Sequence, residues 1–243
     1  MGIKTELGNL FQYFKNRESF TTNDVYIFFS KTQEDIKRAT VNWRIYELVR
    51  LGILKKIGRG VYALGQEKCF TLPLHRKQKS VSFLIKKQFP FIKFCCWHTS
   101  ALKEFYQHVA VRDFLLVEVE RDTIDSVYHF LKETNRNTFK EPSREVIENF
   151  VFDCQDAIIV KALISEAPLQ NIKGISIPSL EKILVDLHAD SDIFFFLQGN
   201  EMLNVLNNVL EKYTINMDRL LRYAKRRNKY EEIQKAINQI SGK

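Results

Sequence analysis

The apolar positions at the start of the chain follow a helical period. Apolar residues at the spacing i, i+4, i+7, i+8 and i+11 predict a first helix over residues 3–15. Phe20 is followed by a polar run, residues 21–24, in which a threonine can cap a second helix. This short second helix is predicted to run through Val25 and Phe28.

A third helix is predicted by Val41, Ile45 and Leu48, which recur at i, i+4 and i+7 and therefore share one face. Its start stays open, because residues 32–35 resemble a capping box whereas Thr40 could equally cap a later start. Polar and cationic residues occupy the rest of the helix surface. We therefore expect one face of this helix in the core and the other face in solvent.

After Gly52, which is placed to end the third helix, the pattern changes to that of strands. Residues 53–57 and 61–64 are strand-like runs, and the glycines of residues 58–60 can adopt the positive φ angles of a tight hairpin. A basic helix followed by a cationic hairpin is typical of a winged helix-turn-helix, whose recognition helix enters the major groove. Residues 1–65 are therefore predicted to form such a domain.

The candidate DNA-binding residues lie on the third helix and on the hairpin. Arginine and asparagine side chains can read base edges, whereas the cations of the hairpin are expected to contact phosphate without identifying the sequence. Trp43 could stack on the DNA backbone or pack beneath the following segment, and packing is the preferred interpretation. The full set is Lys37, Arg38, Thr40, Asn42, Trp43, Arg44, Lys55, Lys56 and Arg59.

The second half of the chain, residues 95–243, has the pattern of a mixed α/β domain. Short apolar runs are interleaved with helical periods, and several helical stripes follow Pro178. The chain is thus predicted to be α+β, with an N-terminal winged helix-turn-helix followed by a mixed domain that ends in a helical segment. The predicted strands are residues 91–97, 114–119, 150–152, 157–162 and 172–177, and the predicted helices before Pro178 are residues 99–107 and 123–133.

Positive charge is concentrated at the two ends of the chain. The net charge is +8, to which residues 1–65 contribute +5, residues 66–94 contribute +6, residues 95–215 contribute −8 and residues 216–243 contribute +5. A basic block beside a recognition helix is expected for a polyanion partner, so the predicted ligand is double-stranded operator DNA. Residues 66–94 are predicted to be a basic connector, either a solvated linker with a docking helix or a segment that follows the phosphate backbone.

Several classes of protein are not expected. No apolar run approaches 18 residues and the N-terminus lacks the order of a signal peptide, which predicts a cytoplasmic protein without a membrane partner. The four cysteines, Cys69, Cys95, Cys96 and Cys154, are too few and too irregular for a disulfide framework. Cys95 and Cys96 with His98 fit a buried strand end better than a metal site, so neither a metal nor a cofactor is expected.

Two separate parts of the sequence resemble one family. The helix and hairpin read TVNWRIYELVRLGILKKIGRGVYAL, and later segments read IPSLEKILVDL and YTINMDRLLRYAKRR. Together they resemble the AbiEi-type antitoxins of type IV abortive-infection toxin-antitoxin systems. The resemblance implies a DNA-binding repressor that autoregulates its operon. It also implies a C-terminal domain that counteracts a nucleotidyltransferase-type toxin without forming a stable complex with it.

The segments that carry this resemblance contain a second set of charged candidates. Lys182 and Asp186 have the i, i+4 spacing of an ion pair, so a structural role is as good an interpretation there as a functional surface. The cationic cluster further along could bind nucleic acid or balance the acidic middle of the chain. The set is Glu181, Lys182, Asp186, Arg222, Lys225, Arg226 and Arg227.

Two other functions and the oligomeric state are left open by the residues. The predicted winged helix could pack on a protein partner and never contact DNA. A metal-dependent nuclease is a third hypothesis, because Asp113, Glu118 and Glu120 could hold Mg²⁺, but the expected lysine two residues after the second acid is absent. The alternating V-E-V-E around Glu118 is more simply an edge strand with one solvated face, and the chain is not expected to be an enzyme.

Overall fold

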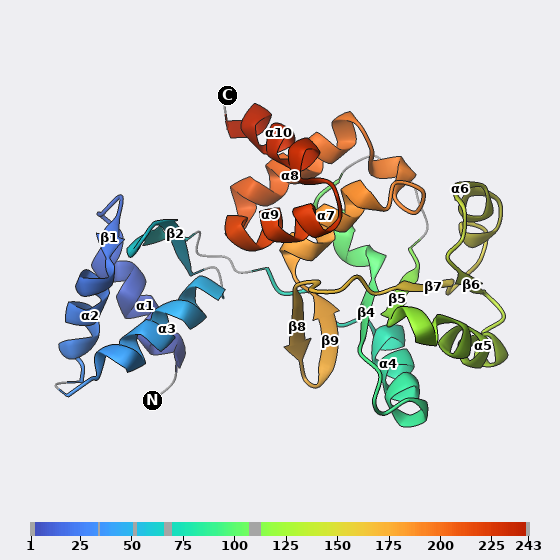
Figure 1. Ribbon diagram of the computed structural model, residues 1–243, viewed down its shortest axis with the longest axis horizontal. Coiled ribbons are helices and arrows are strands. Elements are labelled where there is room, and N and C mark those ends of the chain that lie inside the picture. The colour runs from blue at the N-terminus through green and yellow to red at the C-terminus, as the bar shows by residue number, and fades with distance from the viewer. Residues whose placement is uncertain (1–2, 34, 51–52, 66–69, 107–112, 242–243) are drawn as a thin grey trace. The chain divides into compact units, whose positions relative to one another are not determined.

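The computed structural model describes residues 3–33, 35–50, 53–65, 70–106 and 113–241, and the chain divides into two compact units (Figure 1). Unit 1 contains residues 1–70 and 210–216, and unit 2 contains residues 71–209 and 217–243. The elements make a mixed α+β protein whose C-terminal part is helical, as predicted. Within the described residues, every helix is too short or too polar to cross a bilayer.

Unit 1 is built from three helices and a small antiparallel sheet. The order is α1 (Ile3–Phe14), β1 (Phe20–Thr21), α2 (Thr22–Ser30), α3 (Arg38–Arg50), β2 (Leu54–Gly58) and β3 (Val61–Leu64). The strands pair in the order β1-β3-β2, so the strand before α2 joins the hairpin that follows α3. The three helices and the hairpin that the sequence predicts in this region are therefore present.

Local signals explain where these elements begin and end. Thr21 and Asp24 form a capping box at the start of α2, in which the Asp24 amide donates to Thr21 Oγ1 at 3.2 Å and the Thr21 amide donates to Asp24 Oδ2 at 2.7 Å. Gly60 has a φ of +70° in the hairpin turn, where a Cβ atom would be strained. Helix α3 begins at Arg38, between the two predicted starts, and Gly52 lies outside the described residues.

The core of unit 1 joins its helices to its sheet. Phe14 of α1 is fully buried and stacks on Phe20 of β1, with ring centroids 4.0 Å apart. The predicted stripe of Val41, Ile45 and Leu48 is buried in the same cluster, which confirms that these residues share a core face. Burial of this stripe also determines which side of α3 faces solvent.

Unit 2 is organised around a four-stranded sheet in the order β4-β5-β7-β6, in which β4 is antiparallel to β5 and the other pairs are parallel. Its elements as far as the last of these strands are α4 (Arg76–Gln88), β4 (Phe94–His98), η1 (Thr99–Glu104), β5 (Leu115–Val119), η2 (Arg121–Thr123), α5 (Ile124–Thr134), β6 (Thr138–Lys140), α6 (Arg144–Val146), η3 (Ile147–Val151) and β7 (Ile158–Ala162). The strand predicted at residues 150–152 is wrong, because this short apolar run continues a π-helical turn.

A hairpin and a helical segment complete the chain. They are β8 (Leu169–Ile172), β9 (Ile175–Pro178), α7 (Leu180–Ala189), η4 (Phe195–Leu197), α8 (Asn200–Lys212), α9 (Met217–Arg226) and α10 (Tyr230–Ser241). The single strand predicted at residues 172–177 is confirmed only over residues 175–177, which belong to β9. Residues 173–174 are the turn of the β8–β9 hairpin, where Gly174 has a φ of +81°. In unit 2, α4 and α5 lie on one side of the sheet and α7 and α9 on the other (Figure 1).

The two faces of the sheet differ because side chains alternate along each strand. Val117 and Val160 face α4 and α5 in an apolar core, whereas Glu118 and Lys161 point to the opposite face. Strand β5 lies between β4 and β7, and Glu118 is completely buried. The expectation that the V-E-V-E run forms an edge strand with a solvated face is therefore wrong.

The segment predicted as a basic connector, residues 66–94, contains a docking helix, which is part of one of its two interpretations. Residues 71–94 belong to unit 2, and α4 packs on the sheet through Val81 and Ile85, which are buried. The positive charge of this segment therefore lies mainly on the solvent side of a packed helix. A charge count along the sequence could not distinguish that arrangement from a solvated linker.

Candidate functional site

The solvent side of α3 is aromatic at its centre. Trp43 and Tyr46 are each 64% exposed, and they lie three residues apart on the side opposite Val41 and Ile45. The expectation that Trp43 packs beneath the following segment is therefore wrong. Sequence reasoning missed Tyr46, although its position opposite the buried stripe is a signal that identifies it.

The two arginines predicted to read bases lie at the flanks of α3 and reach back toward α2. The Arg38 guanidinium is 4.7 Å from the ring centre of Tyr26, and the Arg44 guanidinium is 4.7 Å from that of Phe29. Each arginine also donates one long hydrogen bond of 3.4 Å to a side-chain amide oxygen. A guanidinium has five N–H donors, so these contacts hold the two arginines in place and leave donors for a ligand.

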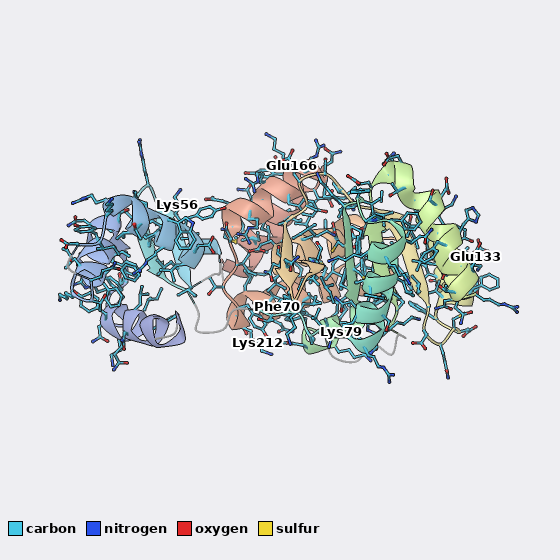
Figure 2. All side chains as sticks on the ribbon, turned by 90° about the horizontal axis from the view of Figure 1, so that it is seen from below. Lys56, Phe70, Lys79, Glu133, Glu166 and Lys212 are labelled. Atoms are coloured by element: carbon cyan, nitrogen blue, oxygen red, sulfur yellow. The ribbon has the colours of Figure 1, made fainter. Side chains whose placement is uncertain are left out.

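The remaining candidates of unit 1 are on its surface. The exposed residues are Lys37, Thr40, Asn42, Lys55, Lys56 and Arg59, and Lys56 is labelled in Figure 2. Lys55 pairs across the hairpin with Ala63, and Lys56 pairs with Tyr62. Successive side chains of a strand point to opposite faces, so the two lysines lie on different sides of the hairpin. A duplex on one side of the hairpin would therefore meet one of them more closely than the other.

Unit 2 contains a buried cluster of charges around Lys182 of α7. Its ammonium lies 2.6 Å from both carboxylate oxygens of Glu118 and 2.5 Å from Asp186 Oδ2, and all three side chains are almost completely buried. The Trp97 indole N–H donates to Glu118 Oε1 at 3.3 Å, and the Tyr223 hydroxyl donates to Asp186 Oδ1 at 2.9 Å. These contacts join β4 and β5 to α7 and α9.

Three further charges extend this cluster toward the surface. Arg227 lies 3.5 Å from Asp186 and 2.6 Å from Asp190, and Lys161 of β7 forms an ion pair with Asp190. We call the whole group the Lys182 cluster, and it consists of Trp97, Glu118, Lys161, Lys182, Asp186, Asp190, Tyr223 and Arg227. It contains three positive and three negative charges and is therefore neutral as a whole.

The charges of the Lys182 cluster stabilise one another. Burial alone would lower the pKa of Lys182. The carboxylates of Asp186 and Glu118 raise it by more than burial lowers it, so the pKa lies well above its usual value. Burial would raise the pKa of Asp186, but Lys182, Lys161 and Arg227 hold it below its usual value. Lys182 and Asp186 are therefore both ionised at neutral pH, as expected of a structural ion pair that cross-links distant elements.

The seven C-terminal candidates do not form one surface. Lys182, Asp186 and Arg227 belong to the Lys182 cluster, which bears out their structural interpretation. Glu181 is buried as well, and it lies 3.7 Å from Arg219. The exposed members are Arg222, Lys225 and Arg226. Sequence reasoning missed Tyr223, although it lies one helical turn before Arg227 and therefore shares its face.

The three carboxylates of the nuclease hypothesis have separate partners. Asp113 lies 2.5 Å from the Lys103 ammonium, and Glu120 accepts a hydrogen bond from the backbone amide of Lys93 at 3.0 Å. Glu118 is enclosed in the Lys182 cluster, where both of its oxygens contact Lys182. A divalent cation would have to displace that ammonium from a buried position, so the arrangement does not favour metal-dependent cleavage.

Two stacked histidines lie near the start of α4. His75 accepts a hydrogen bond from the Lys77 amide as part of the helix cap, and its ring stacks on His98 with centroids 4.0 Å apart. Burial first, and the neighbouring His75 second, lower the pKa of His98 to about 4. His98 is therefore neutral at physiological pH and acts as a packed, hydrogen-bonded ring.

Comparison with known families places the chain in one of them. Residues 40–243 match a family of unknown function, DUF6577, and the chain belongs to this family. The matched region begins within α3 and contains the hairpin of unit 1 and all of unit 2. A comparison with curated proteins gave no match.

Proposed function

We propose that the protein is a sequence-specific DNA-binding transcriptional regulator of the cytoplasm, in which unit 1 acts as a winged helix-turn-helix. The element order α1-β1-α2-α3-β2-β3 and the strand pairing β1-β3-β2 support this proposal, because a winged helix requires three helices followed by a hairpin. In this arrangement α3 is the recognition helix and the β2–β3 hairpin is the wing. The proposal requires that the solvent side of α3 be chemically suited to a duplex.

The observation that carries the proposal is the set of exposed polar and cationic side chains on these two elements. Thr40 and Asn42 on α3 are exposed, and Arg38 and Arg44 flank the helix with donors to spare. Side chains of these types read base edges in the major groove, with arginine directed to guanine and asparagine to adenine. The exposed Lys55, Lys56 and Arg59 of the hairpin supply the phosphate contacts that position the helix.

The finer part of the proposal is that this regulator is an antitoxin of the AbiEi type, which autoregulates its operon and counteracts a nucleotidyltransferase toxin. The resembling segments of the sequence support it, because two of them are in contact. IPSLEKILVDL contains Lys182 and Asp186, and YTINMDRLLRYAKRR contains Tyr223 and Arg227. Both segments therefore contribute to the Lys182 cluster, which gives them a shared structural reason to occur together.

Gel-shift titration with the protein's own upstream DNA tests the DNA-binding function. We expect binding that weakens steeply between about 50 and about 200 mM salt, because counterions are released from each contacted phosphate. Arg59→Ala, and at least one of Lys55→Ala and Lys56→Ala, should reduce the slope of log K against log salt by about 0.9. The matched control is Lys87→Ala, an exposed lysine of α4 in unit 2, which should leave the slope unchanged.

A second titration tests sequence reading. The double variant Arg38→Ala/Arg44→Ala should lose discrimination between the upstream DNA and a scrambled duplex, by about 1 to 3 kcal/mol for each base contact removed. Absent binding, salt-insensitive binding, or an equal loss in Lys87→Ala would overturn the proposal. The antitoxin part is tested separately: the neighbouring reading frame should encode a nucleotidyltransferase, and this chain should rescue the growth of cells that express that enzyme.

A second candidate function is a protein-docking surface, and the exposure of Trp43 and Tyr46 favours it. Large aromatic residues are enriched at the centres of protein interfaces, and these two occupy the centre of the free side of α3. Under this alternative, Trp43→Ala/Tyr46→Ala would abolish capture of a protein partner, and Arg38→Ala/Arg44→Ala would leave DNA affinity unchanged. The gel-shift series therefore separates the two functions.

A further inference from the structure

We propose that a cavity in unit 2 binds a small organic anion with an aromatic or other apolar body. The cavity has a volume of about 550 Å³, within the range of sites that hold drug-sized ligands. It lies beside the carboxyl ends of the parallel strands β5 and β7, because Glu120 and Arg121 follow the first strand and residues 163–167 follow the second. Ligands of open α/β sheets bind at this edge.

The apolar part of the cavity fits a flat or aliphatic ligand body. Its walls include Ile92 and Phe94 at the start of β4, Leu163 and Ile164 after β7, and Leu169 of the β8–β9 hairpin. Leu169 is 37% exposed, and Leu163 and Ile164 are only half-buried. A ligand that covers these side chains removes apolar surface from water, which favours binding.

The charged part of the cavity selects an anion. Lys86, Lys93 and Arg121 line it, and within the described residues neither the Lys93 ammonium nor the Arg121 guanidinium has a carboxylate oxygen within 4 Å. Of the two lining carboxylates, Glu120 is engaged by the backbone amide of Lys93, and Glu166 lies on the exposed turn after β7 (Figure 2). Cations therefore outnumber carboxylates at this site.

A fourth cation reaches the rim of the cavity from the C-terminal helices. Arg226 of α9 donates from Nε to the Ser165 hydroxyl at 2.8 Å, and Ser165 lines the cavity. The Lys86 ammonium donates to the Gly174 carbonyl, which ties α4 to the β8–β9 hairpin across the site. Arg226 and Lys86 thus have a defined place at this cavity. A planar anionic head such as a carboxylate, or a phosphate, can bind both an arginine fork and a lysine.

This proposed anion site does not rest on the proposed DNA binding by unit 1. Titration of the full chain with the fluorescent probe 1-anilinonaphthalene-8-sulfonate, an aromatic anion, tests it. We expect a saturable, one-to-one increase in fluorescence. Phenyl phosphate should displace the probe, whereas phenol and inorganic phosphate at the same concentration should not, because each lacks one half of the recognised chemistry. Displacement by phenol to the same extent would overturn the anionic part of the proposal.

Charge variants locate the probe. Lys93→Ala/Arg121→Ala should weaken probe binding at least tenfold, whereas the matched control Lys79→Ala/Lys87→Ala should bind as the parent does. The control residues are exposed on α4 and do not line the cavity, and Lys79 is labelled in Figure 2. Ile164→Glu, which places a negative charge in the apolar wall, should also abolish binding. Absence of saturable binding, or equal affinity in the cavity and control variants with unchanged circular dichroism, would overturn the inference.

Discussion

Replacement of Lys182 by methionine tests the view that the Lys182 cluster anchors α7 and α9 to the sheet. Methionine keeps most of the side-chain volume but removes the ammonium group, with its charge and its hydrogen-bond donors. The variant leaves Asp186 with Arg227 at 3.5 Å and the Tyr223 hydroxyl at 2.9 Å, so this carboxylate stays compensated. Among the residues that the structure describes, Glu118 then keeps the Trp97 indole N–H, at 3.3 Å, as its hydrogen-bond donor. The loss of folding stability should therefore arise mainly from the Glu118 carboxylate, which is left buried without a compensating charge.

The magnitude follows from the burial of Glu118, which is complete. Removal of one partner from a buried ion pair costs about 3 to 5 kcal/mol, because the other charge is left without compensation. We therefore expect Lys182→Met to lower the free energy of unfolding of unit 2 by about 4 kcal/mol. The double variant Lys182→Met/Glu118→Gln removes the stranded charge and should be more stable than Lys182→Met alone.

Urea unfolding followed by tryptophan fluorescence measures this effect. The chain has two tryptophans, so in a Trp43→Phe background the emission reports on Trp97 within the cluster. With a slope of about 2 kcal/mol per molar urea, the expected loss lowers the midpoint by about 2 M. The matched control is Lys140→Met, which breaks an ion pair with Asp125 of similar length, 2.6 Å, but on the surface, and it should leave the midpoint unchanged. Equal shifts in the two variants, or no recovery in the double variant, would refute the reasoning.

Three further predictions concern single features of the fold. Trp43→Ala/Tyr46→Ala should change the stability of unit 1 by less than about 0.5 kcal/mol, because both side chains are largely exposed, while gel shifts show weaker DNA binding. Gly60→Ala should lower the stability of unit 1 by about 1 kcal/mol, because the turn needs a positive φ at this position. Gly58 has no such requirement, so Gly58→Ala should destabilise unit 1 less. Calorimetry in which the two variants lose equal stability would contradict this. The pKa of His98 is lowered to about 4 in the folded chain, below its unfolded value, so the unfolded chain binds the extra proton and stability should decline as pH falls from about 6.5 toward 4. Urea midpoints between pH 7 and pH 5 should show this decline in the parent and not in His98→Asn.

The organisation of unit 1 could be predicted from the sequence because its signals are local. The stripe of Val41, Ile45 and Leu48 lies within two helical turns, and burial of one helix face imposes that spacing. The capping threonine and the glycines of the hairpin likewise act on residues next to them. The local pattern of apolar and polar residues likewise identified the exposed cations of the hairpin, because charged side chains occupy positions that the core does not require.

The sequence by itself therefore determined the helices, the hairpin and the core face of α3, as well as the i, i+4 pair of Lys182 and Asp186. Only the tertiary structure decided that Glu118, 64 residues before Lys182, is its second partner. It also decided that residues 71–94 pack on the sheet and that Trp43 stays in solvent. The physical reason is that periodicity records how one element divides its surface between core and water, whereas the pairing of distant charges depends on which strands and helices become neighbours.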